Sequence, residues 1–133
     1  MNTKNVITIA CLSALIAVML GALGAHALKP HLSNDQLASF ETGVKYQFYH
    51  SLAILLLAAL SDKLNPKRSV LAFRFFIAGM VLFSGSIYLL SLRDLIGLAS
   101  FKWLGPLTPF GGLCLMSGWI CFLWAANSAN KNN

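Results

Sequence analysis

The chain has 133 residues, of which 57% are hydrophobic and only 11% are charged. A soluble domain carries about 25% charged residues, so this composition excludes an ordinary soluble globule. Ten Lys and Arg residues against four Asp and Glu residues give a net charge of +6. The basic residues stand between apolar runs and form no single patch, which is typical of membrane-flanking charges and argues against nucleic-acid binding.

The first apolar run covers residues 5–28, contains no formal charge and ends at Lys29-Pro30. A bilayer-spanning helix needs about 20 residues, so the run predicts a span at approximately 6–28, ended by the proline. A cleaved signal peptide is the alternative, because Ala25-His26-Ala27 has the small-residue cleavage pattern. The apolar region of a signal peptide is only about 7–15 residues long, and the length of this run therefore favours a permanent helix.

The second predicted helix has two parts. Ser33 and Gln36 have the spacing of a capping box, which predicts a helix start at this point. The first turns, through Lys45, are amphipathic and mildly charged, whereas the segment from Tyr46 to Ser61 carries no charge. We expect an amphipathic lead-in that enters from the interface, followed by a membrane segment at approximately 44–61.

A third span is predicted at 70–92, after a basic segment at 62–69. The segment contains Asn65-Pro66, a turn signal, and three basic residues, so we expect a short exposed loop. The apolar run that follows holds one charge, Arg74, close to its start.

The last span is predicted at approximately 109–126. Residues 93–102 are only partly apolar and are expected to lie at the membrane interface beside Trp103. Thr108 as N-cap, with Pro109 at the first helical position, predicts the start of the final helix. Together, the four runs predict an all-α membrane protein in which residues 1–133 form one integral membrane domain with four transmembrane helices.

The distribution of Lys and Arg predicts the orientation. With four spans, one side of the membrane carries six basic residues and the other carries four. The six are Lys4, Lys63, Lys67, Arg68, Arg74 and Lys131, and the four are Lys29, Lys45, Arg93 and Lys102. Because basic residues concentrate in cytoplasmic loops, both termini are predicted to be cytoplasmic.

Small residues recur on one face of three of the predicted helices, where they would allow close helix packing. The first helix has Ala14, Ala17, Gly21 and Ala25, the third has Ala72, Gly79 and Ser86, and the fourth has Gly111, Cys114, Gly118, Cys121 and Ala125. These spacings predict a tight antiparallel four-helix bundle with a left-handed twist. The seam on the fourth helix is also compatible with contact to a second copy of the chain.

The polar residues gather at the predicted outer end of the bundle. The candidate polar site consists of His26, Glu41, Tyr46, Tyr49 and His50. A titratable group such as His50 inside an apolar run is a functional hypothesis, because it could relay protons or bind a polar ligand. The alternative is structural, since interfacial tyrosines are common and a neutral histidine can bond a carbonyl group.

The sequence predicts no catalytic residues, no metal site and no cofactor. The candidate zinc ligands, His26, His50 and Glu41, come from different elements and lack the local i, i+4 pair of a metalloprotease helix. A Gly-x-Ser-x-Gly nucleophile motif is absent from the sequence. The three cysteines lie inside apolar segments, at spacings that suit neither a disulfide framework nor a zinc site.

Three stretches together resemble a known family. They are GALGAHALKPHL at 21–32, FETGVKYQFYHSLAILL at 40–56 and LGPLTPFGGLCLMSGW at 104–119. The chain is similar to the YgdD/YwdK type of small multi-pass inner-membrane proteins of unknown function. The matching residues are Gly21, Gly24, Ala25, His26, Ala27, Leu28, Phe40, Tyr46, His50, Thr108, Pro109, Gly111, Gly112, Gly118 and Trp119. The resemblance implies a bacterial inner membrane location and four spans, without an assigned chemistry.

Two functions remain open from the sequence. The first is a non-enzymatic integral membrane protein that acts by helix packing with a membrane partner, a second copy or lipid, because small-residue seams are present and a catalytic constellation is not. The second is a small carrier or sensor that uses His26, Tyr46 and His50 as an outward-facing polar site.

Overall fold

The computed structural model describes residues 2–97 and 104–128, and these residues form helices without a strand. The helices are α1 (Thr3–Leu23), the π-helix η1 (Gly24–Leu28), α2 (Asn34–Ala59), the short 3-10 helix η2 (Ser61–Lys63), α3 (Pro66–Leu92) and α4 (Leu107–Asn127). The all-helical prediction is confirmed for these residues. Three stretches are long and apolar enough to cross a membrane, namely Thr3–Leu28, Pro66–Leu92 and Leu107–Asn127.

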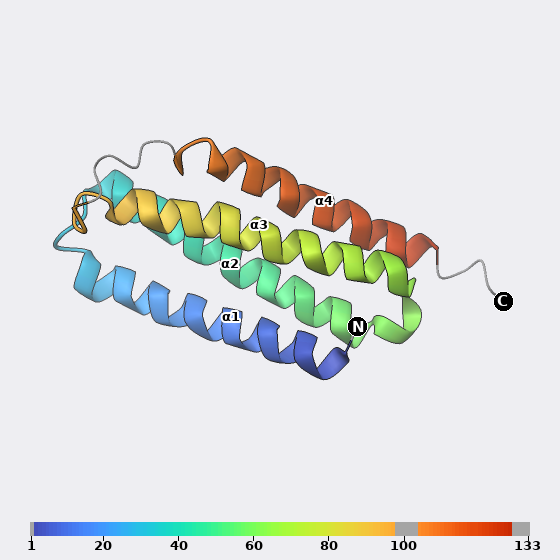
Figure 1. Cartoon of the computed structure of the whole chain (residues 1–133). Helices are drawn as coiled ribbons and strands as arrows, with labels where there is room; N and C mark the ends of the chain where they lie inside the picture. Colours follow the sequence, from blue (N-terminus) through green and yellow to red (C-terminus); the bar gives the residue numbers. More distant parts are fainter. Residues whose placement is uncertain (1, 98–103, 129–133) are drawn as a thin grey trace.

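The four long helices lie side by side along one bundle, with α2 between α1 and α3 (Figure 1). At one end, the Asn65 amide donates to the Ala125 carbonyl (3.0 Å), and Thr3 and Ser61 line the same small cavity. We call this end, which holds the start of α1 and the end of α4, the terminal end. At the opposite end, Gln36 Nε2 donates to Asp94 Oδ2 (2.9 Å).

The start of α2 is the capping box that the sequence predicts. Ser33 Oγ accepts a hydrogen bond from the Gln36 amide (3.2 Å), and Gln36 Oε1 accepts one from the Ser33 amide (2.9 Å). These bonds satisfy two backbone donors that the first turn of a helix cannot pair internally.

Replacing Ser33 with alanine is expected to lower the free energy of unfolding by about 1 kcal/mol, because the cap would be lost. An unfolding titration in mixed micelles measures the change. Ser39→Ala is the matched control, since Ser39 is an exposed serine six positions further along the chain, within α2. Equal stability of the two variants would contradict a stabilising role for the capping box.

The segment 62–69 is not the exposed loop predicted from its composition. Residues 61–63 form η2, Leu64 and Ser69 are buried, and α3 begins at Pro66. Asn65 caps α3, because its side chain accepts a hydrogen bond from the Arg68 amide (3.3 Å). The Asn-Pro pair therefore acts as a helix start, with proline at the first position, where a missing N–H has no cost.

The predicted start of α4 is also wrong, by two residues. The helix begins at Leu107 after Pro106, so Thr108 is not its N-cap. The Thr108 hydroxyl instead lies 2.7 Å from the Ser86 hydroxyl of α3. A contact with the neighbouring helix has replaced the local cap. Residues 98–102 of the predicted interfacial segment, and Trp103 beside it, lie outside the described residues.

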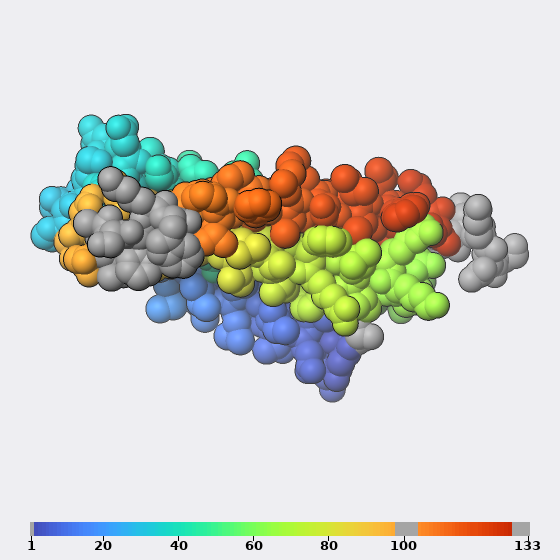
Figure 2. Space-filling view, turned by 45° about the horizontal axis from the view of Figure 1, so that its top comes forward, coloured from blue at the N-terminus to red at the C-terminus, as the bar shows by residue number. Residues whose placement is uncertain are grey.

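Helices α3 and α4 approach each other most closely at three glycines, along the contact visible in Figure 2. A Cβ atom at Gly111 would lie 2.3 Å from the Phe83 backbone nitrogen, and one at Gly79 would lie 2.9 Å from that of Leu115. At Gly118 the added atom would lie 2.5 Å from the Phe76 ring. The seam predicted on the fourth helix is therefore occupied by α3 within the same chain.

The packed face of α1 departs from the predicted one at its end. Ala17 is fully buried, and Gly21 lies close to Val44 of α2, where an added Cβ would be 3.3 Å from Val44 Cγ1. Ala25 is exposed, and the buried position is Gly24, which packs against Phe40. Gly24 is seven residues after Ala17, so it continues the packed face with the spacing of a heptad repeat. Ala25, which is four residues after Gly21, instead points away from α2.

Candidate functional site

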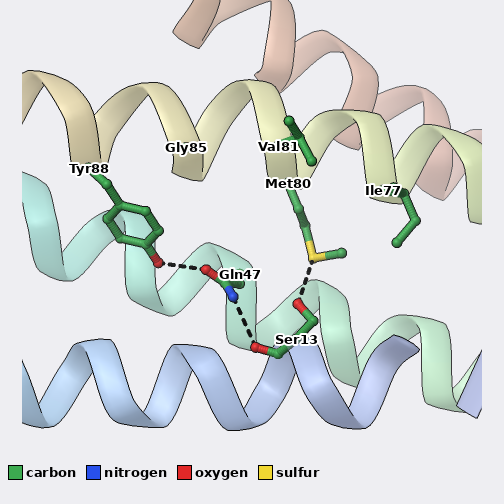
Figure 3. A pocket seen from close by; sticks show the side chains of 7 residues that line it. All are labelled: Ser13, Gln47, Ile77, Met80, Val81, Gly85 and Tyr88. Carbon is green, nitrogen blue, oxygen red and sulfur yellow. Dashed lines mark hydrogen bonds between the residues drawn. The ribbon is translucent and has the colours of Figure 1, made fainter. Parts of the chain in front are cut away.

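A crevice of about 360 Å³ lies between α1, α2 and α3 (Figure 3). It is lined by Ser13, Gln47, Ile77, Met80, Val81, Gly85 and Tyr88. The side chain of Val81 at its rim is 67% exposed, so the crevice is open at the surface of the bundle. A Cβ atom at Gly85 would meet nothing within 4 Å, which shows that this position borders open space.

The side chain of Gln47 connects the three helices around the crevice. Its Nε2 donates to the Ser13 carbonyl of α1 (2.9 Å), and its Oε1 accepts from the Tyr88 hydroxyl of α3 (2.8 Å). Figure 3 shows the amide between these two partners. One polar side chain from α2 therefore fixes the positions of both neighbours.

A second set of polar groups continues the network one turn along α2. Ser51 Oγ lies 2.8 Å from Ser13 Oγ and 2.7 Å from the Gln47 carbonyl. The Met80 sulfur lies 3.8 Å from Ser13 Oγ and 3.9 Å from Ser51 Oγ. Ser51 is fully buried, so this set closes the crevice toward the centre of the bundle.

The network lies far from both ends of the bundle. With a rise of 1.5 Å per residue, Met80 is roughly 21 Å along α3 from Pro66 and roughly 18 Å from Leu92. Ser13 is at the same level, because its hydroxyl is in contact with the Met80 sulfur. At such a depth in a bilayer, water is not available to satisfy polar groups, so they must bond to each other or to a ligand.

His50 belongs to a separate cluster that joins α2 to α4. Its Nδ1 lies 2.7 Å from the Tyr46 carbonyl, and its Nε2 lies 3.2 Å from the Trp119 indole nitrogen. A carbonyl group only accepts and an indole N–H only donates, so both contacts are satisfied by a neutral imidazole with its proton on Nδ1. The ring centroids of Phe76 and Trp119 lie 5.6 and 6.1 Å from that of His50.

The structure brings Tyr46 and His50 together, with ring centroids 5.9 Å apart, but it does not bring all five predicted polar residues into one site. His26 is exposed on η1. It lies close to the position of Phe40 along the bundle, since Gly24, two residues before it, packs against the Phe40 ring. His50 is ten residues further along α2, roughly 15 Å away along the helix axis. Glu41 is exposed and lies 3.9 Å from exposed Lys45, which is a solvated i, i+4 pair. Tyr46 and Tyr49 are 40% and 57% exposed.

Sequence reasoning did not select Ser13, Gln47, Ser51 or Met80. Gln47 and Ser51 are one helical turn apart in the charge-free part of α2, and polar side chains in such a run tend to bond across helices. That signal was available in the sequence. The partners could not be identified, because Ser13 and Met80 are ordinary residues of apolar helices until the bundle brings them together.

Within residues 2–97 and 104–128, no group of three or more His, Cys, Asp or Glu residues is arranged to hold a metal ion. The three cysteines are free: Cys11 is exposed, Cys114 is half-buried and Cys121 is buried. The polar groups at the crevice and around His50 are neutral hydrogen-bonding groups.

Comparison with known proteins gives consistent matches. Residues 20–112 match the family described as protein of unknown function (DUF423). The chain is 40% identical to the UPF0382 membrane protein YwdK of Bacillus subtilis, over 92% of this chain and 96% of the relative. It is 36% identical to a UPF0382 membrane protein of Staphylococcus aureus, over 92% and 94% of the two chains. No solved structure matches. The predicted resemblance is confirmed, and the chain belongs to the DUF423 family, whose relatives here are the UPF0382 membrane proteins.

Proposed function

We propose that this protein is a non-enzymatic, four-span protein of the bacterial inner membrane that holds an apolar membrane molecule in the crevice. The observation that carries the proposal is the crevice itself. It is open at the surface of the bundle, it lies deep along the helices, and it presents neutral hydrogen-bonding groups. A soluble ligand would not reach such a position, whereas a molecule dissolved in the bilayer would meet it directly.

The packing of α2 supports four spans in an antiparallel bundle. Near its start, Phe40 contacts Gly24, and past its end, Ser61 lines a cavity together with Thr3. α2 therefore runs along the whole of the first apolar stretch. If α1 and α3 cross the bilayer, α2 crosses with them, and its exposed charges at Glu41 and Lys45 lie at the interface.

The terminal end carries the features of a cytoplasmic interface. Arg68 lies over the Trp124 ring at 4.4 Å and donates to the Trp124 carbonyl (3.2 Å) and to the Ser128 hydroxyl. Lys4, Lys63 and Lys67 belong to the same end and are exposed. This basic cluster supports cytoplasmic termini, because Lys and Arg are enriched on that side.

Two observations favour an apolar membrane molecule over the other functions. The small-residue seam of α4 is used within the chain, so its outer face presents large apolar residues to the bilayer. They are Phe110, Leu113, Met116, Ile120, Leu123 and Trp124. The carrier or sensor alternative uses His26, Tyr46 and His50 as an outward-facing polar site, whereas both ring nitrogens of His50 have partners in the bundle.

The topology is tested by single cysteine substitutions at the two ends of α2. We expect His31→Cys to react with a membrane-impermeant maleimide added outside spheroplasts, and Lys63→Cys to react only after permeabilisation. Both positions are exposed. The unsubstituted chain is the control for its three native cysteines. Labelling of both variants from the same side would contradict a membrane crossing by α2.

Occupation of the crevice is tested by filling it. We expect native mass spectrometry of the gently released protein to show a bound apolar molecule that is lost in Gly85→Leu. The substitution should be tolerated, because a Cβ at this position meets nothing within 4 Å. Ala78→Leu is the matched control, since Ala78 is an exposed small residue of α3 outside the crevice. A bound molecule retained equally by both variants would place it elsewhere on the protein.

A further inference from the structure

We infer that the crevice selects a neutral, carbonyl-bearing apolar molecule of the quinone class, that the Gln47 amide N–H donates to its carbonyl oxygen, and that Tyr88 holds the amide in position. This inference rests on the proposed function and names the ligand chemistry. Three properties of the crevice support it: the neutral charge of its lining, the hydrogen-bonding capacity of the Gln47 amide and the depth of its polar groups.

The lining indicates an uncharged ligand. All seven residues around the crevice have neutral side chains. A charged group placed there would lose its hydration without gaining an ion-pair partner, which is strongly unfavourable in a low-dielectric region. Fatty acids, amines and phosphate-bearing head groups are therefore unsuitable occupants of the crevice itself.

The Gln47 amide has a donor to offer to the ligand. A primary amide carries two N–H bonds, and within the described residues Gln47 Nε2 makes one hydrogen bond, to the Ser13 carbonyl. Its oxygen is already engaged by the Tyr88 hydroxyl. Because an unpaired N–H is costly away from water, an acceptor atom in the crevice would be favoured. A carbonyl oxygen meets that requirement without introducing charge.

The depth of Gln47 in the bilayer favours a quinone over a phospholipid as the source of the carbonyl. Gln47 is one turn, or about 6 Å, from the level of Ser51 and Ser13, which lies near the middle of the bundle. The hydrocarbon core is about 30 Å thick, so phospholipid esters lie roughly 15 Å from its centre. A carbonyl that reaches Gln47 therefore belongs to a molecule that lies within the hydrocarbon region, with an apolar tail against Ile77 and Val81.

The experiment measures binding of three probes to the full chain in lipid nanodiscs by native mass spectrometry. The probes are a decyl-substituted benzoquinone, decylbenzene, which lacks a carbonyl, and didecanoyl phosphatidylcholine, whose ester carbonyls are held near the interface by its head group. We expect the quinone to bind the unsubstituted protein roughly fivefold to tenfold more tightly than decylbenzene, as one net hydrogen bond allows. Didecanoyl phosphatidylcholine should bind no better than decylbenzene.

Three variants and one control connect that selectivity to the named residues. Gln47→Leu should reduce the quinone preference to less than twofold, and Gly85→Leu should abolish binding of all probes. Tyr88→Phe should weaken quinone binding, whereas Tyr49→Phe, which changes an exposed tyrosine outside the crevice, should not. The probe comparison in the unsubstituted protein remains decisive if Gln47→Leu fails to fold.

The outcomes separate the two levels of the proposal. Equal binding of quinone and decylbenzene, lost in Gly85→Leu, would overturn the carbonyl inference and leave the crevice as a site for apolar molecules. Preferential binding of didecanoyl phosphatidylcholine would overturn the assignment by depth. Absence of binding by every probe, together with no bound molecule in the natively released protein, would overturn the proposed function as well.

Discussion

Replacing Gly111 with alanine is expected to destabilise the bundle by about 2–3 kcal/mol, toward the upper end of the range for overpacked positions. The added Cβ atom would lie 2.3 Å from the Phe83 backbone nitrogen and 2.7 Å from its Cα. Backbone atoms cannot move aside as a side chain can, so α3 and α4 would have to separate. An unfolding titration in mixed micelles measures the loss directly.

Gly112 provides the matched control. It is the adjacent glycine on the same helix, and a Cβ atom there would meet only the Phe83 ring, at 3.8 Å. Gly112→Ala should therefore leave the stability unchanged within about 0.5 kcal/mol, or increase it slightly through the higher helix propensity of alanine. If the two alanine variants were equally stable, the close approach of α3 and α4 at Gly111 would be contradicted.

Replacing His50 with alanine is expected to cost about 2–4 kcal/mol, as for other large buried side chains. The histidine is 6% exposed, packs among the rings of Phe76 and Trp119, and connects α2 to α4 through the Trp119 indole N–H. Its removal would leave a cavity and an indole donor without its partner. The change in the free energy of unfolding is the measurement.

A double-mutant cycle isolates the hydrogen bond from the packing. Trp119→Phe keeps an aromatic ring and removes the donor, and its coupling to His50→Ala should be about 0.6–1.7 kcal/mol, the range for polar contacts between membrane helices. His31→Ala, at an exposed histidine, should have no effect on stability. Full stability of His50→Ala would contradict the structural role of His50 and restore the functional alternative.

The candidate site shows how far sequence reasoning extends. The sequence predicts His50 as a candidate site residue, because it is a titratable residue in an apolar run. In the bundle, however, both of its ring nitrogens have hydrogen-bond partners, in Tyr46 and Trp119. Gln47 is only three residues away and was not predicted as a site residue, although its side chain bonds to both α1 and α3. Residue type alone could not distinguish them, because the difference depends on which helices face each residue.

The sequence by itself determined the helical class, the approximate course of the helices and the relation to a membrane family. These properties depend on local features such as long charge-free runs, the Ser33 capping box and the proline after the first helix. Only the tertiary structure decided that Thr108 contacts Ser86 instead of capping α4, and that Gly24 replaces Ala25 in the packed face. The crevice also exists only in the tertiary structure. Its lining residues come from three helices, and the relative positions of these helices are fixed by packing between them, which the sequence of each helix does not specify.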